Sequence, residues 1–119
     1  MPLQGIGYHT LFDFFDCDSD LLNNLEALKT LMLQAARASG ATIIGEYSHR
    51  FNPYGISSMI ILAESHLSLH TWPEYHFAAA DLFSCNPNID AQKAGEVLKS
   101  SLKPKSCKCS LQQRGQREL

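Results

Sequence analysis

The chain has 119 residues, a formal net charge of −2 and scattered basic residues, so it is long enough for one domain with a hydrophobic core and lacks the charge pattern of a nucleic-acid-binding protein. No apolar run approaches the roughly 20 residues that cross a bilayer, and the N-terminal stretch MPLQGIGYH lacks the features of a secretory signal. We therefore expect a single cytoplasmic domain over residues 1–119 that binds neither nucleic acid nor membrane and keeps its four cysteines reduced.

The N-terminal third predicts a strand followed by a helix. Aromatic and apolar residues partly alternate in GYHTLFDFFDC (7–17), which indicates a strand with one face in the core. Asp18 is a good helix cap, and from Leu21 apolar residues recur at helical spacing until Gly40, a residue type that often ends a helix. One helix is therefore expected between residue 18 and Gly40.

The remainder of the chain predicts most of a sheet. Four strand-like segments follow, at residues 41–51, 55–64, 66–72 and 76–85. The connections between them are too short for parallel crossovers, so these strands should pair antiparallel. A second helix is expected at 89–102 and a last strand at 105–112. This order predicts an α+β fold, a two-layer α/β sandwich whose antiparallel sheet carries its helices on one face.

The second face of such a sheet would also need cover. We assign the apolar residues Ile44, Ile60 and Leu62 to this face, and a second copy of the chain is the simplest cover for it. We therefore expect a homodimer whose sheets pack face to face, giving a four-layer αββα assembly.

The segment AESHLSLHTWPE (63–74) places two histidines four residues apart. On a helix this spacing would let His66 and His70 bind one metal ion, but in a strand they would lie about 13 Å apart, too far for one ion. No third ligand stands at a recognisable spacing. The pair Cys107 and Cys109 fits neither a redox C-x-x-C pattern nor a zinc knuckle, so we interpret it as strand packing. We expect no metal site.

The same segment carries a resemblance to a known family. Residues 64–74, ESHLSLHTWPE, and DLFSC at 81–85 closely resemble the prokaryotic-type S-adenosylmethionine decarboxylase proenzymes, the short pyruvoyl-dependent class. The resemblance extends upstream to GAT (40–42), HRF (49–51) and PYGIS (53–57), and so covers nearly the whole chain. It implies an enzyme that decarboxylates S-adenosylmethionine to the aminopropyl donor of polyamine (spermidine) biosynthesis.

The resemblance also implies that the chain cleaves itself. The hydroxyl of Ser65 would attack the carbonyl of Glu64 and convert the amide to an ester, which requires a strained backbone. Loss of the Cα proton of residue 65 would then eliminate the ester, and hydrolysis would release ammonia and leave a covalently bound pyruvoyl group. The products would be a β chain of residues 1–64 and an α chain of residues 65–119.

Three further residues match catalytic positions of the family. His70 matches the base of the processing reaction, and imidazole suits this role because it titrates near neutral pH. Ser57 matches the hydroxyl that supports the oxyanion. The pyruvoyl carbonyl would form a Schiff base with the amino group of the substrate and withdraw electrons from its carboxylate bond. Cys85 matches the proton donor to the decarboxylated carbon, although a lone cysteine is more often an inert buried thiol.

Substrate contacts are implied for three residues. Phe51 and Trp72 match aromatic positions where stacking and cation–π contacts would favour the adenine and the sulfonium of the substrate. Glu74 matches an acidic residue near the ribose. Without the resemblance, Phe51 and Trp72 would be assigned equally well to packing in a core or an interface.

Two alternatives remain open. The chain departs from the usual pattern at Ser58-Met59, His76-Phe77, Ala80 and Asn86-Pro87. An altered pocket would suit decarboxylation of ornithine or arginine, for which the same pyruvoyl machinery would serve. The other alternative is a non-cleaving partner that regulates an active homologue. A protein of that kind has no physical need for Ser57, Ser65, His70 and Cys85 together.

Overall fold

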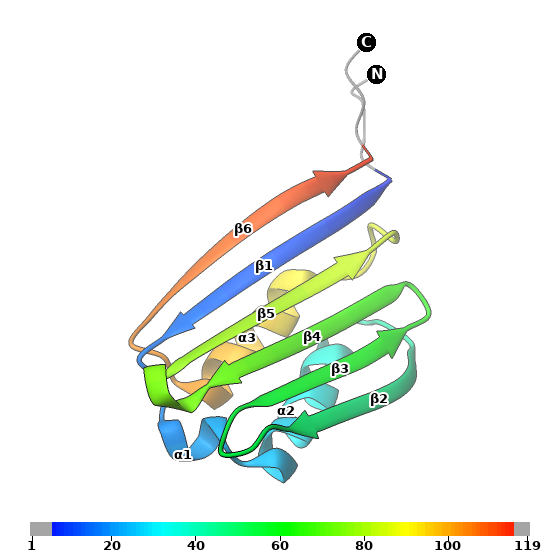
Figure 1. Cartoon of the computed structure of the whole chain (residues 1–119). Coiled ribbons are helices and arrows are strands. Elements are labelled where there is room, and N and C mark those ends of the chain that lie inside the picture. Colours follow the sequence, from blue (N-terminus) through cyan, green and yellow to red (C-terminus); the bar gives the residue numbers. More distant parts are fainter. Residues whose placement is uncertain (1–5, 116–119) are drawn as a thin grey trace.

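The computed structural model describes residues 6–115, which build a six-stranded sheet with helices on one face (Figure 1). The strands are β1 (Gly7–Phe15), β2 (Ile43–Arg50), β3 (Ile56–Leu62), β4 (Ser65–Trp72), β5 (Phe77–Ser84) and β6 (Ser106–Arg114). They lie in the order β2-β3-β4-β5-β1-β6, and every neighbouring pair is antiparallel. The helices are α1 (Ser19–Leu22), α2 (Leu25–Ala38) and α3 (Ala91–Leu102), with a short 3-10 helix, η1 (Pro73–Tyr75). The predicted fold class is confirmed.

Both ends of the predicted domain 1–119 lie outside the described residues, namely residues 1–5 and 116–119. The cytoplasmic prediction rests on the N-terminal stretch MPLQGIGYH, and the first five residues of this stretch also lie outside the described residues. Among residues 6–115, none of the helices is long and apolar enough to cross a membrane.

The prediction of one helix after residue 18 is wrong, because two helices occupy this segment. Asp18 caps α1 as expected, accepting a hydrogen bond of 2.9 Å from the backbone N–H of Asp20. The helix ends at Leu22, and Asn24 then starts α2 by accepting a hydrogen bond of 3.1 Å from the N–H of Ala27. Apolar spacing predicted the buried face correctly, but it carries no information about this polar break.

Asn23, at the break, binds the connection between β2 and β3. Its side chain accepts a hydrogen bond of 3.1 Å from the N–H of Gly55, and its carbonyl accepts one of 2.9 Å from the guanidinium of Arg50. The groups of Asn23 thus hold a distant turn at the point where α1 ends.

The core lies between the helices and one face of the sheet. Ile60 is 0% exposed and Leu62 is 3% exposed on this covered face, so their assignment to the uncovered face is wrong. β3 has apolar residues on both faces, and alternation alone cannot tell which face meets the helices. Ile44 is 66% exposed and lies where the register of β2 and β3 shifts.

The face of the sheet opposite the helices, here called the open face, carries other apolar residues. Leu11, Tyr47, Ile61 and Trp72 point to this side and are between 36% and 75% exposed. The open face is therefore apolar enough to need a cover, but through other residues than those predicted. The homodimer stays a prediction.

The cysteines differ in their exposure. Cys17, just after β1, is 2% exposed, and burial together with the carboxylate of Asp16 raises its pKa from 9.0 to about 11. Cys85, Cys107 and Cys109 are exposed. The interpretation of Cys107 and Cys109 as packed strand residues is therefore wrong, because β6 is an edge strand exposed along its length.

We predict that Cys17 reacts with a thiol reagent far more slowly than the other three cysteines in the folded protein at pH 8. The thiolate is the reactive species, and both burial and the raised pKa keep Cys17 protonated. The test follows reagent uptake before and after denaturation and compares the Cys17→Ala variant. Equal rates for all four thiols in the folded wild type would contradict this description of the core.

Candidate active site

Five predicted site residues line one cavity of about 320 Å³ on the open face, where β3 begins and β4 ends. They are Phe51, Ser57, His70, Trp72 and Glu74. Phe51 precedes the turn between β2 and β3, and Glu74 lies in η1. The structure thus gathers residues that are up to 23 positions apart in the sequence.

Ser57 and His70 are directly opposite each other on β3 and β4. The hydroxyl of Ser57 lies 2.9 Å from Nδ1 of His70, within hydrogen-bond distance. Ser58, in contrast, is 2% exposed on the covered face and lies 3.0 Å from the hydroxyl of Ser48. Strand alternation therefore leaves only Ser57 of the two serines in reach of the imidazole.

Thr71 holds this end of β4 in place from the covered face of the sheet. Its buried hydroxyl accepts a hydrogen bond of 2.9 Å from the N–H of Ile56 and donates one of 2.8 Å to the carbonyl of Leu22. It thereby joins β4 to the start of β3 and to α1. Its neighbours His70 and Trp72 are held on the opposite side of the strand, facing the cavity.

Aromatic rings form part of the cavity wall. Phe51 is 49% exposed and Trp72 is 38% exposed, so both retain accessible ring surface. The imidazole of His49 packs edge-on against Phe51 with ring centroids 4.7 Å apart, and Phe77 packs against Trp72 at 5.5 Å. These neighbours support the rings and leave surface on which a planar or cationic group can bind.

A second group of predicted residues lies at the other end of β4. Glu64 is in the tight turn between β3 and β4, and its side chain accepts a hydrogen bond of 3.1 Å from the N–H of Thr42. Ser65 follows with φ of 152°, a backbone angle that L-residues rarely adopt. The backbone is therefore strained at the position where the resemblance implies cleavage.

Cys85 binds the carbonyl of Glu64 directly. Its backbone N–H donates a hydrogen bond of 3.2 Å to this oxygen, and its thiol lies 3.4 Å from the same atom. The carbonyl that Ser65 would attack thus already accepts two donors of one residue, an arrangement suited to a developing oxyanion.

The two groups do not meet within one chain. His70 is five residues after Ser65 in β4, which separates them by about 16 Å at the usual rise of a strand. Ser65 also pairs with Leu62 and Ser84, which point to the covered face, whereas His70 points to the open face.

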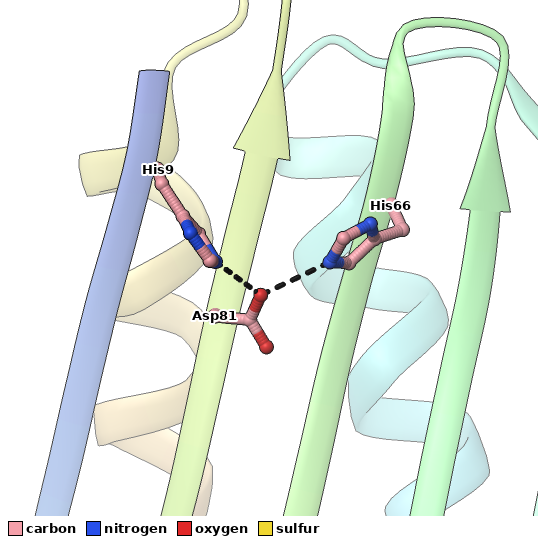
Figure 2. Close-up of side chains that lie close together, drawn as sticks. All are labelled: His9, His66 and Asp81. Atoms are coloured by element: carbon pink, nitrogen blue, oxygen red, sulfur yellow. Dashed lines mark hydrogen bonds and ion pairs between the residues drawn. The ribbon is translucent and has the colours of Figure 1, made fainter. Parts of the chain in front are cut away.

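A cluster that the sequence analysis missed lies on the open face between these groups (Figure 2). Nε2 of His9 and Nε2 of His66 lie 2.6 and 3.0 Å from the same carboxylate oxygen, Oδ2 of Asp81. The hydroxyl of Ser68 donates to the other oxygen, Oδ1. Burial raises the pKa of Asp81, but hydrogen bonds from Ser68, His9 and His66 outweigh it and hold the pKa below its usual value. Only the pairing of β1 with β5 brings His9 here, and no local spacing reveals that pairing.

Comparison with known proteins identifies the family. The family model described as S-adenosylmethionine decarboxylase matches residues 8–115. The chain belongs to the S-adenosylmethionine decarboxylase family. It is 47% identical over 103 residues to the S-adenosylmethionine decarboxylase proenzymes of Thermotoga petrophila and Thermotoga maritima, which covers 87% of this chain and 79% of each relative.

A solved structure agrees with the observed fold. The crystal structure of the adenosylmethionine decarboxylase from Aquifex aeolicus superimposes with a TM-score of 0.86 at 31% sequence identity, and the match covers 97% of this chain and 95% of that one. The resemblance predicted from residues 64–74 is thus confirmed at the level of family and fold.

Proposed function

We propose that the chain is a self-processing, pyruvoyl-dependent decarboxylase of S-adenosylmethionine that acts in the cytoplasm and supplies the aminopropyl donor for polyamine synthesis. The observation that carries the proposal is the strained Ser65 next to a carbonyl held by both donors of Cys85. Family membership supports the substrate, because the relatives are named for it.

In the processing reaction, Oγ of Ser65 adds to the carbonyl carbon of Glu64, and the bond from that carbon to the nitrogen of residue 65 breaks to give an ester. The N–H of Cys85 would stabilise the negative charge on the carbonyl oxygen, since it already donates to that atom. A base must then remove the Cα proton of residue 65. Residue 65, at the head of β4, becomes the pyruvoyl group.

A second copy of the chain would supply that base. His70 and Ser57 lie about 16 Å from Ser65 in their own chain, too far for proton transfer. If two open faces pack together in opposite directions, the Ser57 and His70 end of one chain meets the start of β4 in its partner, where the base would have to reach the backbone Cα proton of residue 65 and not its side chain on the covered face. The exposed apolar residues of the open face favour this contact, and a dimer of this kind has two composite sites.

For decarboxylation, the pyruvoyl group supplies an electron-withdrawing carbonyl to the amino group of the substrate. The chain's own residues bind and orient. The rings of Phe51 and Trp72 would hold the adenine and the sulfonium, and Glu74 would accept hydrogen bonds from the ribose. The thiol of Cys85 is exposed and close to residue 65, so it is placed to deliver a proton to the product carbon.

The cavity favours S-adenosylmethionine over ornithine or arginine. The positions at which the chain departs from the usual pattern are Ser58-Met59, His76-Phe77, Ala80 and Asn86-Pro87, and these do not line the 320 Å³ cavity. Ala80 lies in the core instead, and His76 contacts the carbonyl of Cys17. Phe77 packs behind Trp72 with ring centroids 5.5 Å apart, so of these departures it is the one that touches the aromatic wall, while the lining residues Phe51, Trp72 and Glu74 keep the pattern expected for an adenosyl substrate.

We predict that denaturing mass spectrometry of the purified protein finds two fragments, residues 1–64 and 65–119, and that hydrazine traps a carbonyl on the second. Ser65→Ala removes the attacking hydroxyl and should give one intact mass, no trapped carbonyl and no activity. Ser100→Ala, an exposed serine of α3, is the matched control and should cleave normally. An intact wild-type mass would favour the non-cleaving partner instead.

We predict that two inactive variants complement each other. His70→Ala retains Ser65, and Ser65→Ala retains Ser57 and His70, so a mixed dimer obtained by co-expression contains one complete composite site. The His70→Ala chain should be cleaved in this mixture but not alone. A mixture of Ser57→Ala with His70→Ala has no complete site and should stay uncleaved. Failure of the first mixture, with dimers formed, would exclude the proposed exchange of residues.

We predict release of carbon dioxide from S-adenosylmethionine but not from ornithine or arginine. Trp72→Ala should reduce kcat/KM for S-adenosylmethionine by about 10-fold or more, because a stacked ring contributes on the order of 1–3 kcal/mol per base. Radiolabelled carboxyl groups on the three compounds provide the assay. Activity on an amino acid alone would overturn the substrate assignment and leave the processing chemistry intact.

A further inference from the structure

We propose that His9, His66 and Asp81 form a binding site for a divalent transition-metal ion such as Zn²⁺ on the open face of the sheet. One nitrogen or oxygen donor from each residue lies within 4.8 Å of the other two. The residues come from the three adjacent strands β1, β4 and β5, and their side chains converge above the sheet (Figure 2). None of the three residues lines the 320 Å³ cavity, and His66 directly follows Ser65 in the sequence.

The spacing of the donor atoms is close to what an ion requires. Zinc binds imidazole nitrogen and carboxylate oxygen at about 2.0–2.2 Å, so tetrahedral ligands lie about 3.3 Å from one another. The two nitrogens here lie 2.6 and 3.0 Å from Oδ2 of Asp81. An ion would require these two distances to lengthen by less than about 1 Å, and the two nitrogens lie within 4.8 Å of each other.

Neighbouring side chains fix the orientation of the donors. His9 and His66 both pair with Phe83, one from each side, and their rings pack against its ring with centroids 5.2 and 6.0 Å apart. Ser68 donates to Oδ1 of Asp81 and leaves Oδ2 for the ion. Such supporting contacts around a metal site orient its ligands and raise its affinity.

The donor set selects the class of ion. Two imidazoles and one carboxylate suit Zn²⁺, Co²⁺, Ni²⁺ and Fe²⁺, whereas Mg²⁺ and Ca²⁺ prefer oxygen alone. In the single chain the side chains are 20%, 33% and 20% exposed for His9, His66 and Asp81, so an ion can enter before two open faces pack together. Three protein ligands leave at least one coordination position for water or another group.

One contact opposes the ion. The guanidinium of Arg114 lies 3.5 Å from Nδ1 of His9. The positive charge of the guanidinium at this distance repels a cation bound to the same imidazole. Arg114 should therefore weaken binding of the ion. Its replacement by a neutral residue should raise the affinity, whereas replacement of a ligand should lower it.

The test titrates Co²⁺, followed by its visible d–d absorption, into the full chain after treatment with a chelator, and repeats the titration with Zn²⁺ by calorimetry. We expect one ion per chain. Asp81→Asn and His66→Gln should each weaken binding by about 100-fold or more, since loss of a supporting residue alone costs about 10–100-fold. Arg114→Gln should bind more tightly than the wild type.

The control is His49→Ala, which removes an exposed imidazole outside the cluster and should bind like the wild type. Circular dichroism verifies that each variant is folded, and His66→Gln decides the matter if Asp81→Asn unfolds. Binding that survives both ligand substitutions, equal weakening by His49→Ala, or the intense charge-transfer absorption of cobalt bound to thiolate would each overturn the proposal.

Discussion

β4 is hydrogen bonded along its length to β3 on one side and β5 on the other, and the positions of Ser57, Ser65, His70 and Cys85 depend on the register of these two ladders. The first ladder sets Ser57 opposite His70. The second pairs Ser65 with Ser84, and this places the next residue, Cys85, in contact with the carbonyl of Glu64. Because side chains alternate along a strand, a slip by one residue would turn His70 toward the helices and dismantle the cavity.

The fold was largely predictable because its elements are short-range patterns. Alternation and turn residues predicted the strands, and apolar spacing predicted the buried faces of the helices. The errors arose where a local pattern is decided by distant groups. Asn23, where the helix is interrupted, binds Gly55 and Arg50, and Ile60 faces the helices although β3 is apolar on both sides.

The site residues were predicted by resemblance, not by physics alone, since a lone Ser57 or Cys85 has ordinary structural interpretations. The sequence could not reveal that the predicted residues form two groups at opposite ends of β4, because the motif runs along a single strand. His9 and Asp81 are 72 positions apart and are joined only through the ladder of β1 and β5. Local spacing singled out His66 and His70 as the histidine pair, whereas the structure pairs His66 with His9.

The strand order has a consequence for a chain cut after residue 64. β1, β2 and β3 precede that bond and β4, β5 and β6 follow it, so across the sheet the two pieces alternate, two strands from the first, two from the second and then one from each. The pieces are interleaved, with shared borders at β3–β4, β5–β1 and β1–β6. Neither can be withdrawn without tearing three ladders and the common core, so the nicked molecule would unfold before its parts could dissociate.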